Sequence, residues 1–323
     1  MRLAVIDCGT NTFNLIITEV DATGNYTKLF RTRASVKLGE GAINEGYIAR
    51  EPFRRGLDAI QAFEGFISEH KVDQVLAFAT SAIRDASNGG EFVKMVRDQF
   101  DIEVQVIDGD REAELIYFGT REAVALNDKI ALIMDIGGGS TEFILASKEQ
   151  ILWKQSFRLG AARLLEKISP SDPITEEEVN DLDLYLQEQL QPLFTAIKKH
   201  KPTELIGSSG AFDSLVEMIH GELGGERLLN SKTEYEVDLE NYFKISELVR
   251  RSTLKQRRQI RGLVSMRFDM IVISCQMIDF ILKNLNLKRL RVSIYSLKEG
   301  VVADFISKRT LNSNKDHGKN ISN

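Results

Sequence analysis

The feature that most constrains the fold of this chain is a short motif that occurs twice, one domain length apart. An Ile-Asp-x-Gly-x-x-Thr pattern that contains Asp7 recurs as Met-Asp-x-Gly-x-x-Ser around Asp135, an offset of 128 residues. An offset of that size predicts two related halves rather than an array of short repeats. The chain has 323 residues, of which 43% are hydrophobic, so it can form two cores. We expect domains at 1–126 and 127–306.

Strand-like and helix-like segments alternate around both copies of the motif. Residues 3–6 and 13–20 predict a β-hairpin with a polar tip, and residues 130–136 and 141–146 repeat this pattern around the second copy. The other expected strands are 30–37, 74–80, 103–107 and 151–157, and the expected helices are 51–70, 91–100 and 112–126. The alternation favours α/β sheets with helices packed on them.

The rest of the second half is predicted to be largely helical. Thr175 and Glu178 form a capping-box signal for a long helix that Pro192 should kink or split in two. A short strand at 204–207 should lead through a turn rich in glycine and serine into a helix at 212–220. The polar segment 307–323 is expected to be disordered.

Composition excludes several classes of protein. The net charge of −5 argues against a dedicated nucleic-acid binder. Cys8 and Cys275 have no paired spacing, which indicates a reducing compartment and neither a disulfide framework nor a zinc site. We expect no signal peptide and no membrane span, because the longest apolar stretch, 270–282, is interrupted by polar residues. The expected location is the cytoplasm.

The two hairpin tips have the composition of phosphate-binding loops. Glycines let backbone N–H groups approach an anion, and the side chains of such a loop add donors. The donor side chains are those of Thr10, Asn11, Thr12, Ser140 and Thr141. A carboxylate on each loop, Asp7 and Asp135, would repel phosphate unless a divalent cation or a water lies between them, and Mg²⁺ suits such a site. Each loop taken alone could instead be an ordinary tight turn.

The most specific element is the run Gly137, Gly138, Gly139 between two strands of the second half. Successive glycines weaken a sheet, so the run predicts close approach of the backbone to a ligand.

Two glutamates, Glu112 and Glu142, are candidate general bases. Phosphoryl transfer to water needs an aligned nucleophile, which a carboxylate can orient and deprotonate. Glu112 lies at a strand-to-helix turn that could open on a cleft, and the alternative is an acid that stabilises the first turn of a helix.

Three further groups of residues could bind an anion. Arg84 could clamp phosphate oxygens, or it could form a surface ion pair with Asp85. Ser208 and Ser209 lie in a Gly-Ser-Ser-Gly turn that could contact a nucleotide or simply join a strand to a helix. A basic segment at 250–261 could attract a polyanion, although a solvated helix face is the commoner meaning of such a run.

These motifs together resemble the exopolyphosphatase and guanosine-pentaphosphate phosphohydrolase family, which belongs to the actin, sugar-kinase and heat-shock-ATPase superfamily. The segments that carry the resemblance are 6–15, 79–88, Glu112-Ala113 with Tyr117, and 135–143. Weaker similarities lie at 159–164, 267–269 and 297–300, so the resemblance extends over nearly the whole chain. This chain has Arg111 where the family usually has a glutamate and Lys298 where it usually has an arginine.

The resemblance implies two ribonuclease-H-like domains around a cleft and Mg²⁺-dependent release of orthophosphate from polyphosphate or guanosine pentaphosphate. It assigns Glu112 as the catalytic glutamate, Asp135 and Glu142 as an acidic pair, and Arg84 as a phosphate-binding arginine. With Asp7, the acidic pair completes the expected metal ligands. The resemblance also implies a homodimer, and it implies that the C-terminal helical domain of longer members is missing here.

Two other functions fit the same loops. A catalytically weak sensor could bind a guanosine alarmone, but it would not need the two glutamates. A sugar or acid kinase of the same superfamily would need an adenosine-binding Gly-Gly motif, which the turn at 207–210 matches poorly. The sequence therefore favours an enzyme.

Overall fold

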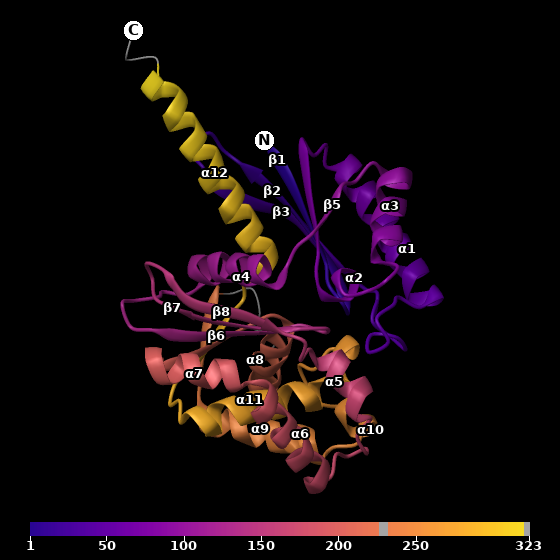
Figure 1. Ribbon diagram of the computed structural model, residues 1–323, viewed down its shortest axis with the longest axis vertical. Helices are drawn as coiled ribbons and strands as arrows, with labels where there is room; N and C mark the ends of the chain where they lie inside the picture. Colours follow the sequence, from indigo (N-terminus) through magenta and orange to yellow (C-terminus); the bar gives the residue numbers. More distant parts are fainter. Residues whose placement is uncertain (226–231, 320–323) are drawn as a thin grey trace.

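The computed structural model describes residues 1–225 and 232–319 and shows two α/β domains stacked one above the other (Figure 1). The first domain contains a five-stranded sheet of order β3-β2-β1-β4-β5. The strands are β1 (Arg2–Cys8), β2 (Thr12–Val20), β3 (Tyr26–Ser35), β4 (Gln74–Ala79) and β5 (Val104–Val106). β2 is antiparallel to both of its neighbours, β1 and β3, whereas β4 and β5 continue the sheet parallel to β1.

The second sheet repeats this topology with one strand added. Its order is β10-β11-β9-β6-β7-β8, so β6, β7, β8, β9 and β11 correspond in turn to β1 to β5. The strands are β6 (Ala131–Ile136), β7 (Thr141–Ala146), β8 (Ile151–Phe157), β9 (Glu204–Ser208), β10 (Glu234–Val237) and β11 (Leu290–Ser293). Two copies of this strand order confirm the prediction of two ribonuclease-H-like domains.

Helices cover both sheets and fill the space between them (Figure 1). In the first domain α1 (Arg50–Glu69) and α3 (Gly89–Phe100) cover one face, and α2 (Ser81–Arg84) follows β4 directly. Between the sheets lie α4 (Gly109–Ala123) and the first turns of α12 (Leu297–Lys319), whose far end projects beyond the first domain. The second domain carries α5 (Ala161–Ile168), α6 (Glu176–Gln189), α7 (Gln191–His200), α8 (Gly210–Glu222), α9 (Leu239–Arg251), α10 (Leu254–Arg257) and α11 (Ile271–Leu285).

Most of the predicted local structure is confirmed. Both motifs lie at the tips of antiparallel hairpins, β1–β2 and β6–β7. The capping box of Thr175 and Glu178 begins α6, and the expected long helix ends at Gln189, where α7 begins with Pro192 in its first turn. A proline there removes no hydrogen bond of the new helix, which is why the break falls at this point.

A pair of glycines brings α4 and α12 into direct backbone contact. A Cβ on Gly119 would lie 2.1 Å from the carbonyl oxygen of Ser296, and a Cβ on Gly300 would lie 1.8 Å from that of Leu115. Real side chains do not approach so closely, so only glycine fits at either position. The crossing of the two helices between the sheets therefore depends on Gly119 and Gly300.

The C-terminal segment differs from its expected disorder. Helix α12 continues to Lys319, and residues 320–323 lie outside the described part of the chain. Its first turns pack against α4 and β1, with Val302 fully buried, and the segment 307–319 contains no proline. Adding residues to an existing helix costs less than starting one, so the polar sequence extends it. Leu297, Val301 and Val302 belong to the core between the two sheets, and the boundary of the second domain stays a prediction.

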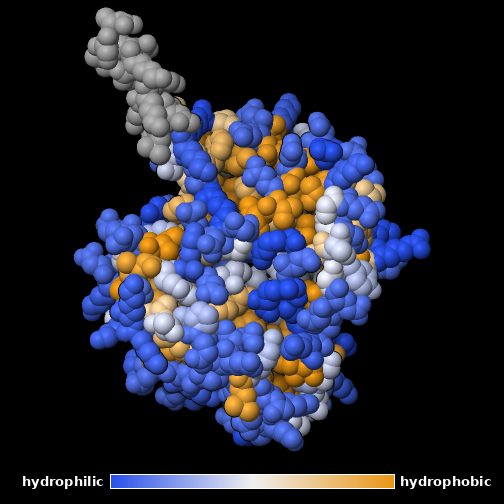
Figure 2. All heavy atoms as spheres, in the orientation of Figure 1, coloured by the Kyte–Doolittle hydropathy of each residue, from blue (hydrophilic) through white to orange (hydrophobic). Residues whose placement is uncertain are grey.

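The surface of the first domain is partly apolar. Figure 2 shows apolar side chains gathered over the first sheet beside β5, where Val106 is 47% exposed. Within residues 1–225 and 232–319, no helix combines the length and the apolar character needed to cross a bilayer.

Candidate active site

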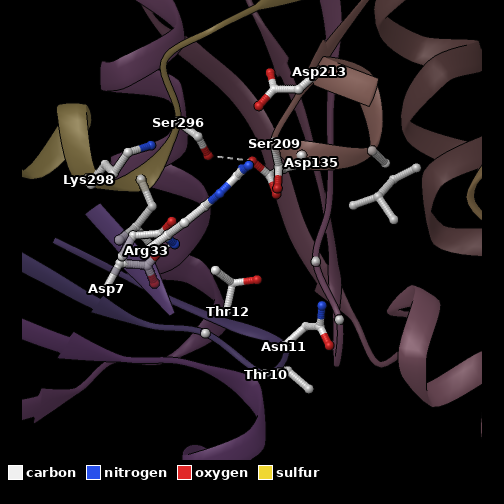
Figure 3. Close-up of a pocket in the computed structure, with 18 of the residues that line it drawn as sticks. Asp7, Thr10, Asn11, Thr12, Arg33, Asp135, Ser209, Asp213, Ser296 and Lys298 are labelled. Carbon is white, nitrogen blue, oxygen red and sulfur yellow. Dashed lines mark hydrogen bonds between the residues drawn. The ribbon is translucent and has the colours of Figure 1, made fainter. Parts of the chain in front are cut away.

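A cavity of about 500 Å³ lies between the two domains, and both hairpin tips open onto it (Figure 3). The predicted residues that line it are Asp7, Thr10, Asn11, Thr12, Glu112, Asp135, Gly137, Gly138, Gly139, Ser140 and Ser209. Segments far apart in the sequence are thus brought to one site, as the repeat predicts.

In the first loop, Asp7 lies near the end of β1 with its carboxylate at the cavity (Figure 3). The amide Nδ2 of Asn14, its partner across the hairpin, donates to Asp7 Oδ2 at 3.0 Å. Burial raises the pKa of Asp7 from 3.8 to about 6, although Lys298 and the Asn14 hydrogen bond oppose the shift. Asp7 is thus a carboxylate with one weak donor, which a cation would stabilise.

In the second loop, two hydroxyl groups hold Asp135. Ser208 Oγ donates to Asp135 Oδ2 at 2.8 Å, and Ser296 Oγ donates to the same oxygen at 2.6 Å. Burial raises the pKa of Asp135, and these two hydrogen bonds oppose the rise. Ser208 therefore orients Asp135 from behind and does not itself line the cavity.

The glycine run has a reason that the sequence did not indicate. A Cβ on Gly139 would lie 2.5 Å from Ser81 Oγ and 2.6 Å from Thr10 Oγ1, and one on Gly138 would lie 3.0 Å from Thr10 Cβ. The second loop is therefore packed against the first loop and α2. The glycines permit close packing of the two domains, and the approach of this backbone to a ligand stays a prediction.

The two loop carboxylates fit a magnesium ion, whereas the third predicted ligand does not join them. Asp7 and Asp135 line the same cavity and supply only oxygen atoms, which suits a cation that keeps several waters. Glu142 is 1% exposed and accepts a hydrogen bond of 2.6 Å from Ser156 Oγ. Among the described residues no three Asp, Glu, His or Cys side chains form a metal-holding cluster, so a role of Glu142 as a ligand stays a prediction.

Glu112 lies in the first turn of α4 and lines the cavity, although it is only 7% exposed. Arg84 Nη1 donates to Glu112 Oε2 at 2.8 Å. Burial and then the charge of Glu142 raise the pKa of Glu112 well above its usual range, and Arg84 opposes them. Burial and then Asp135 raise the pKa of Glu142 to about 7. A pair of carboxyl groups with raised pKa values is suited to accepting a proton near neutral pH.

Besides Ser208, two predicted phosphate-binding residues do not line the cavity. Arg84 donates to the carbonyl oxygen of Ile107 at 3.1 Å as well as to Glu112, so its guanidinium is in a position to orient the glutamate, and its binding of phosphate stays a prediction. Thr141 is fully buried and donates to the carbonyl oxygen of Leu159 at 2.9 Å, because strand alternation directs it away from the face of Glu142.

The basic segment at 250–261 also lies outside the cavity lining. Arg257 is 6% exposed and forms an ion pair with Asp172 at 2.8 Å, while Arg251 is exposed and pairs with Glu247 at 2.8 Å. The segment therefore combines a structural arginine with a solvated helix face.

Several basic side chains at the cavity were assigned no role from the sequence. The residues are Lys28, Arg31, Arg33, Arg267 and Lys298. The first three share one face of β3, because a bulge leaves Leu29 unpaired between Lys28 and Phe30 and so shifts the alternation. The spacing of Arg31 and Arg33 could have predicted a basic strand face. Lys28 could not have been added to that face from the sequence, because the bulge changes the alternation.

Two further acids share the cavity with these cations: Asp213 of α8 (Figure 3), and Glu299 of α12, which forms ion pairs with Lys28 and Lys298. Burial raises the pKa of Asp213 to about 6, and the charges of Arg267 and Lys298 oppose the shift. Burial lowers the pKa of Arg267 to about 10, so it stays positively charged at neutral pH.

The family follows from comparison with known proteins. The model of the Ppx/GppA phosphatase family matches residues 16–309. The chain belongs to the Ppx/GppA phosphatase family. The predicted class, an enzyme that hydrolyses phosphate bonds, is confirmed at this level, whereas its substrate stays a prediction.

Individual relatives agree with this assignment. The chain is 26% identical to exopolyphosphatase 1 of Mycobacterium tuberculosis (strain ATCC 25618 / H37Rv), covering 94% of this chain and 87% of that protein. The crystal structure of an exopolyphosphatase from Cytophaga hutchinsonii is 40% identical, with a TM-score of 0.93 over 95% of this chain and 98% of that one. A family member from Aquifex aeolicus, 23% identical with a TM-score of 0.78 over 96% and 98% of the two chains, shares the fold.

Proposed function

We propose that this protein releases orthophosphate from the end of inorganic polyphosphate. The observation that carries the proposal is that Glu112, both glycine loops and five basic side chains share one cavity between the domains. The loops offer backbone N–H groups and hydroxyls to a terminal phosphate, while the cations suit a chain that carries a negative charge on every internal phosphate. The names of the mycobacterial and Cytophaga relatives support the same substrate.

We propose that Mg²⁺ binds between Asp7 and Asp135 with waters in its remaining positions. When bound, the ion would neutralise charge on the phosphate oxygens. Its presence would also account for the carboxylates of Asp7 and Asp135 lying next to the two phosphate-binding loops.

In the proposed reaction Glu112 orients a water molecule and accepts its proton. The water oxygen attacks the terminal phosphorus, the bond from that phosphorus to the bridging oxygen breaks, and the shortened chain leaves with the bridging oxygen. Arg84 holds Glu112 in place at 2.8 Å. Glu142, whose charge acts on Glu112, is the second candidate for the base.

A second substrate, guanosine pentaphosphate, is favoured by one observation. Asp213 places a carboxylate in a cavity otherwise rich in cations. Such a group contributes nothing favourable to a bare phosphate chain, but it can accept hydrogen bonds from a guanine base or a ribose hydroxyl.

The test is phosphate release in Mg²⁺ from short polyphosphate, long polyphosphate and guanosine pentaphosphate. We expect Glu112→Gln to lower kcat by about 10²- to 10⁴-fold while substrate binding persists, because the variant keeps the shape of the side chain but loses the base. Asp213→Asn should affect the guanosine substrate more than polyphosphate. Tight nucleotide binding without release from any substrate would refute the hydrolase and support an alarmone sensor.

We further propose a cytoplasmic homodimer. The exposed apolar surface beside β5 is compatible with self-association, and both cysteines are free, as in a reducing compartment. Light scattering on the purified protein and cell fractionation test the two statements separately, and a monomer at all concentrations would refute the first.

A further inference from the structure

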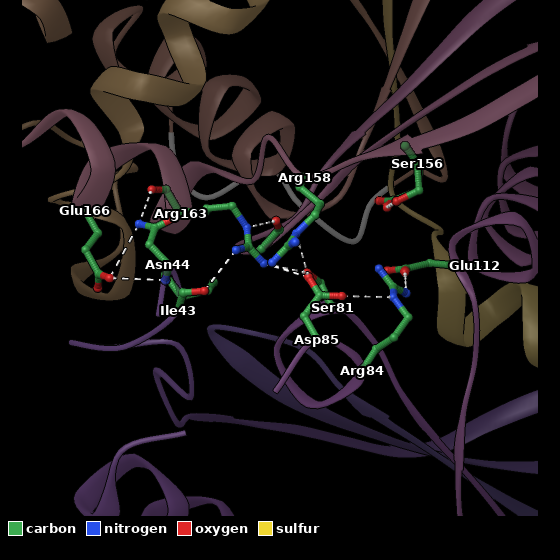
Figure 4. Close-up of polar contacts among 12 residues, drawn as sticks. Ile43, Asn44, Ser81, Arg84, Asp85, Glu112, Ser156, Arg158, Arg163 and Glu166 are labelled. Atoms are coloured by element: carbon green, nitrogen blue, oxygen red, sulfur yellow. Dashed lines mark hydrogen bonds and ion pairs between the residues drawn. The ribbon is translucent and has the colours of Figure 1, made fainter. Parts of the chain in front are cut away.

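Arg163 of α5 crosses from the second domain into the first (Figure 4). It is 5% exposed and donates within its own domain to the carbonyl oxygen of Gly139 at 2.8 Å. Its other acceptors belong to the first domain: the Ile43 carbonyl oxygen at 2.9 Å, Ser81 Oγ at 3.4 Å and Asp85 Oδ2 at 2.8 Å. A planar guanidinium with acceptors on several sides has one orientation, which requires both domains to be in their present positions.

The local sequence seats α5 directly on the second glycine loop. The backbone N–H of Arg163 donates to the Gly138 carbonyl oxygen at 3.0 Å, and the backbone N–H of Ala161 donates to the Gly137 carbonyl oxygen at 2.9 Å. A Cβ on Gly160 would lie 2.3 Å from Gly138, so only glycine permits this approach. The N-terminal end of α5 therefore fixes the base of Arg163 relative to the loop.

Most of the positively charged groups around Asp85 come from the other domain. Its Oδ2 lies 2.8 Å from Arg163 Nη2 and 3.2 Å from Arg158 Nε, and both arginines belong to the second domain. In the part of the chain that the structure describes, Arg84 is the one other cation within 4.0 Å, at 3.6 Å.

Arg84 lies between two carboxylates, those of Asp85 and Glu112. Its Nη1 donates to Glu112 at 2.8 Å, whereas its Nε remains 3.6 Å from Asp85 Oδ1. While the second domain neutralises Asp85, the shorter contact of Arg84 is with Glu112. Without Arg163, Asp85 would attract Arg84 more strongly and weaken its hold on Glu112.

We propose that Arg163 is a positioning residue that makes the contact between Arg84 and Glu112 depend on closure of the two domains. Glu112 is then oriented only when the glycine loop carried by the second domain is in place against the first. The inference rests on the proposed hydrolysis and on the role of Glu112 in it.

The same interface supplies a matched control, Glu166. Its Oε2 accepts from the backbone N–H of Gly41 at 3.0 Å, and its Oε1 lies 3.5 Å from Asn44. Within the described part of the chain, Glu166 thus joins the two domains without a hydrogen bond or ion pair to the glycine loop or to Asp85. Glu166→Gln should change kcat by less than about twofold.

The decisive experiment is a double-mutant cycle between Arg163 and Asp85. Arg163→Gln should lower kcat by about 10- to 100-fold with little change in KM, since small displacements of a reacting group have effects of this size. Asp85→Asn removes both the charge that competes for Arg84 and the carboxylate partner of Arg163, so by itself it should lower kcat less than Arg163→Gln does. Added to Arg163→Gln, it should restore most of the lost kcat, which a merely structural role for Arg163 would not produce.

Domain closure is measured independently of activity. Dyes attached to cysteines introduced at the exposed positions Ser68 and Glu188, one in each domain, report the distance between the domains, since the native cysteines are buried. Arg163→Gln should lengthen this distance, and Glu166→Gln should do so less.

Three results would overturn the proposal: a kcat for Arg163→Gln within twofold of the control, no recovery in the double variant, or an unchanged distance. If Arg163→Gln fails to fold, Arg163→Lys combined with Asp85→Asn provides the same cycle. Wild-type protein that releases no phosphate from any substrate would refute the proposed function instead, and the distance measurement would still test the role of Arg163 in closure.

Discussion

The two hairpin loops have the same backbone and different chemistry. Their glycines serve one purpose, because a Cβ on Gly9 would lie 2.9 Å from the Thr12 carbonyl oxygen and one on Gly137 would lie 3.0 Å from that of Ser140. Their first acids also correspond, since Asp7 and Asp135 occupy the same place in each hairpin.

The loops differ in the residue that lies opposite Asp7 or Asp135 on the second strand of each hairpin. Asp7 is opposite Asn14, which donates a hydrogen bond to it, whereas Asp135 is opposite Glu142, which adds a second charge. They also differ at the tip, where the second loop has glycines opposite the side chain of Thr10. The two copies of the motif have therefore become complementary. The first loop contributes the side chain of Thr10 and a neutral partner for its acid, whereas the second loop contributes glycines that make room for Thr10 and an acidic partner for its acid.

The largest expected effect comes from giving the second loop the partner of the first. Glu142→Asn should lower phosphate release by about 10²- to 10⁴-fold, because it removes a carboxylate that acts on Glu112 and is itself a candidate base. Steady-state kinetics on polyphosphate would measure the loss. The reciprocal control, Asn14→Asp, keeps Glu142, so a loss of equal size there would show that the hairpin tolerates no change at either position.

Complementarity at the tip predicts a rescue. Gly138→Ala should destabilise the folded protein by about 1–3 kcal/mol, because the new methyl group meets Thr10 at 3.0 Å. Combined with Thr10→Gly, it should cost less than the sum of the two single changes. Urea unfolding of the four proteins measures the coupling, and strictly additive free energies would contradict packing between the loops.

The smallest expected effect is a difference between Asp7 and Asp135 in how their replacement changes the free energy of unfolding with pH. Asp7 has a folded-state pKa of about 6, above its usual 3.8. A raised pKa gives stability that is complete below the unfolded value and is lost as the pH rises through the folded one. Without divalent cations, Asp7→Asn should therefore raise the free energy of unfolding by about 1–2 kcal/mol near pH 8 and by much less near pH 4.

The matching change at Asp135 sharpens this prediction. Asp135→Asn should gain less stability than Asp7→Asn, because Ser208 and Ser296 both donate to the Asp135 carboxylate. Unfolding curves at the two pH values measure both variants. A larger gain at Asp135 would contradict the contrast between one donor and two.

Local patterns were sufficient to predict most of the fold. The repeat around Asp7 and Asp135 located both hairpins, and Thr175 with Pro192 located a helix start and a helix break, because each depends on neighbouring residues alone. The path of α12 was not predictable in this way. It depends on the contact of Gly119 with the start of that helix, nearly two hundred residues later, which no local pattern contains.

Site residues that belong to one sequence motif could be predicted, whereas those whose position depends on contacts between distant segments could not. Asp135 and the glycines of its loop line the cavity as expected. Arg84 was expected to bind phosphate, but burial beside Glu112 gives it a carboxylate partner. Arg33 was not predicted to line the cavity. The alternation of residues along a strand indicates which side chains share a face, but it does not indicate what that face contacts in the folded protein.

The contact between Gly119 and Gly300 has a mechanical consequence. Glu112 and Gly119 lie on the same face of α4, about 10 Å apart along its axis. Since the two backbones touch at Gly119, α12 can turn about that point but cannot press closer to α4. A tag or partner attached to the far end of α12 would therefore act on a helix whose contact point with α4 lies two turns from Glu112, so that a force applied there would be transmitted to the part of α4 that carries Glu112.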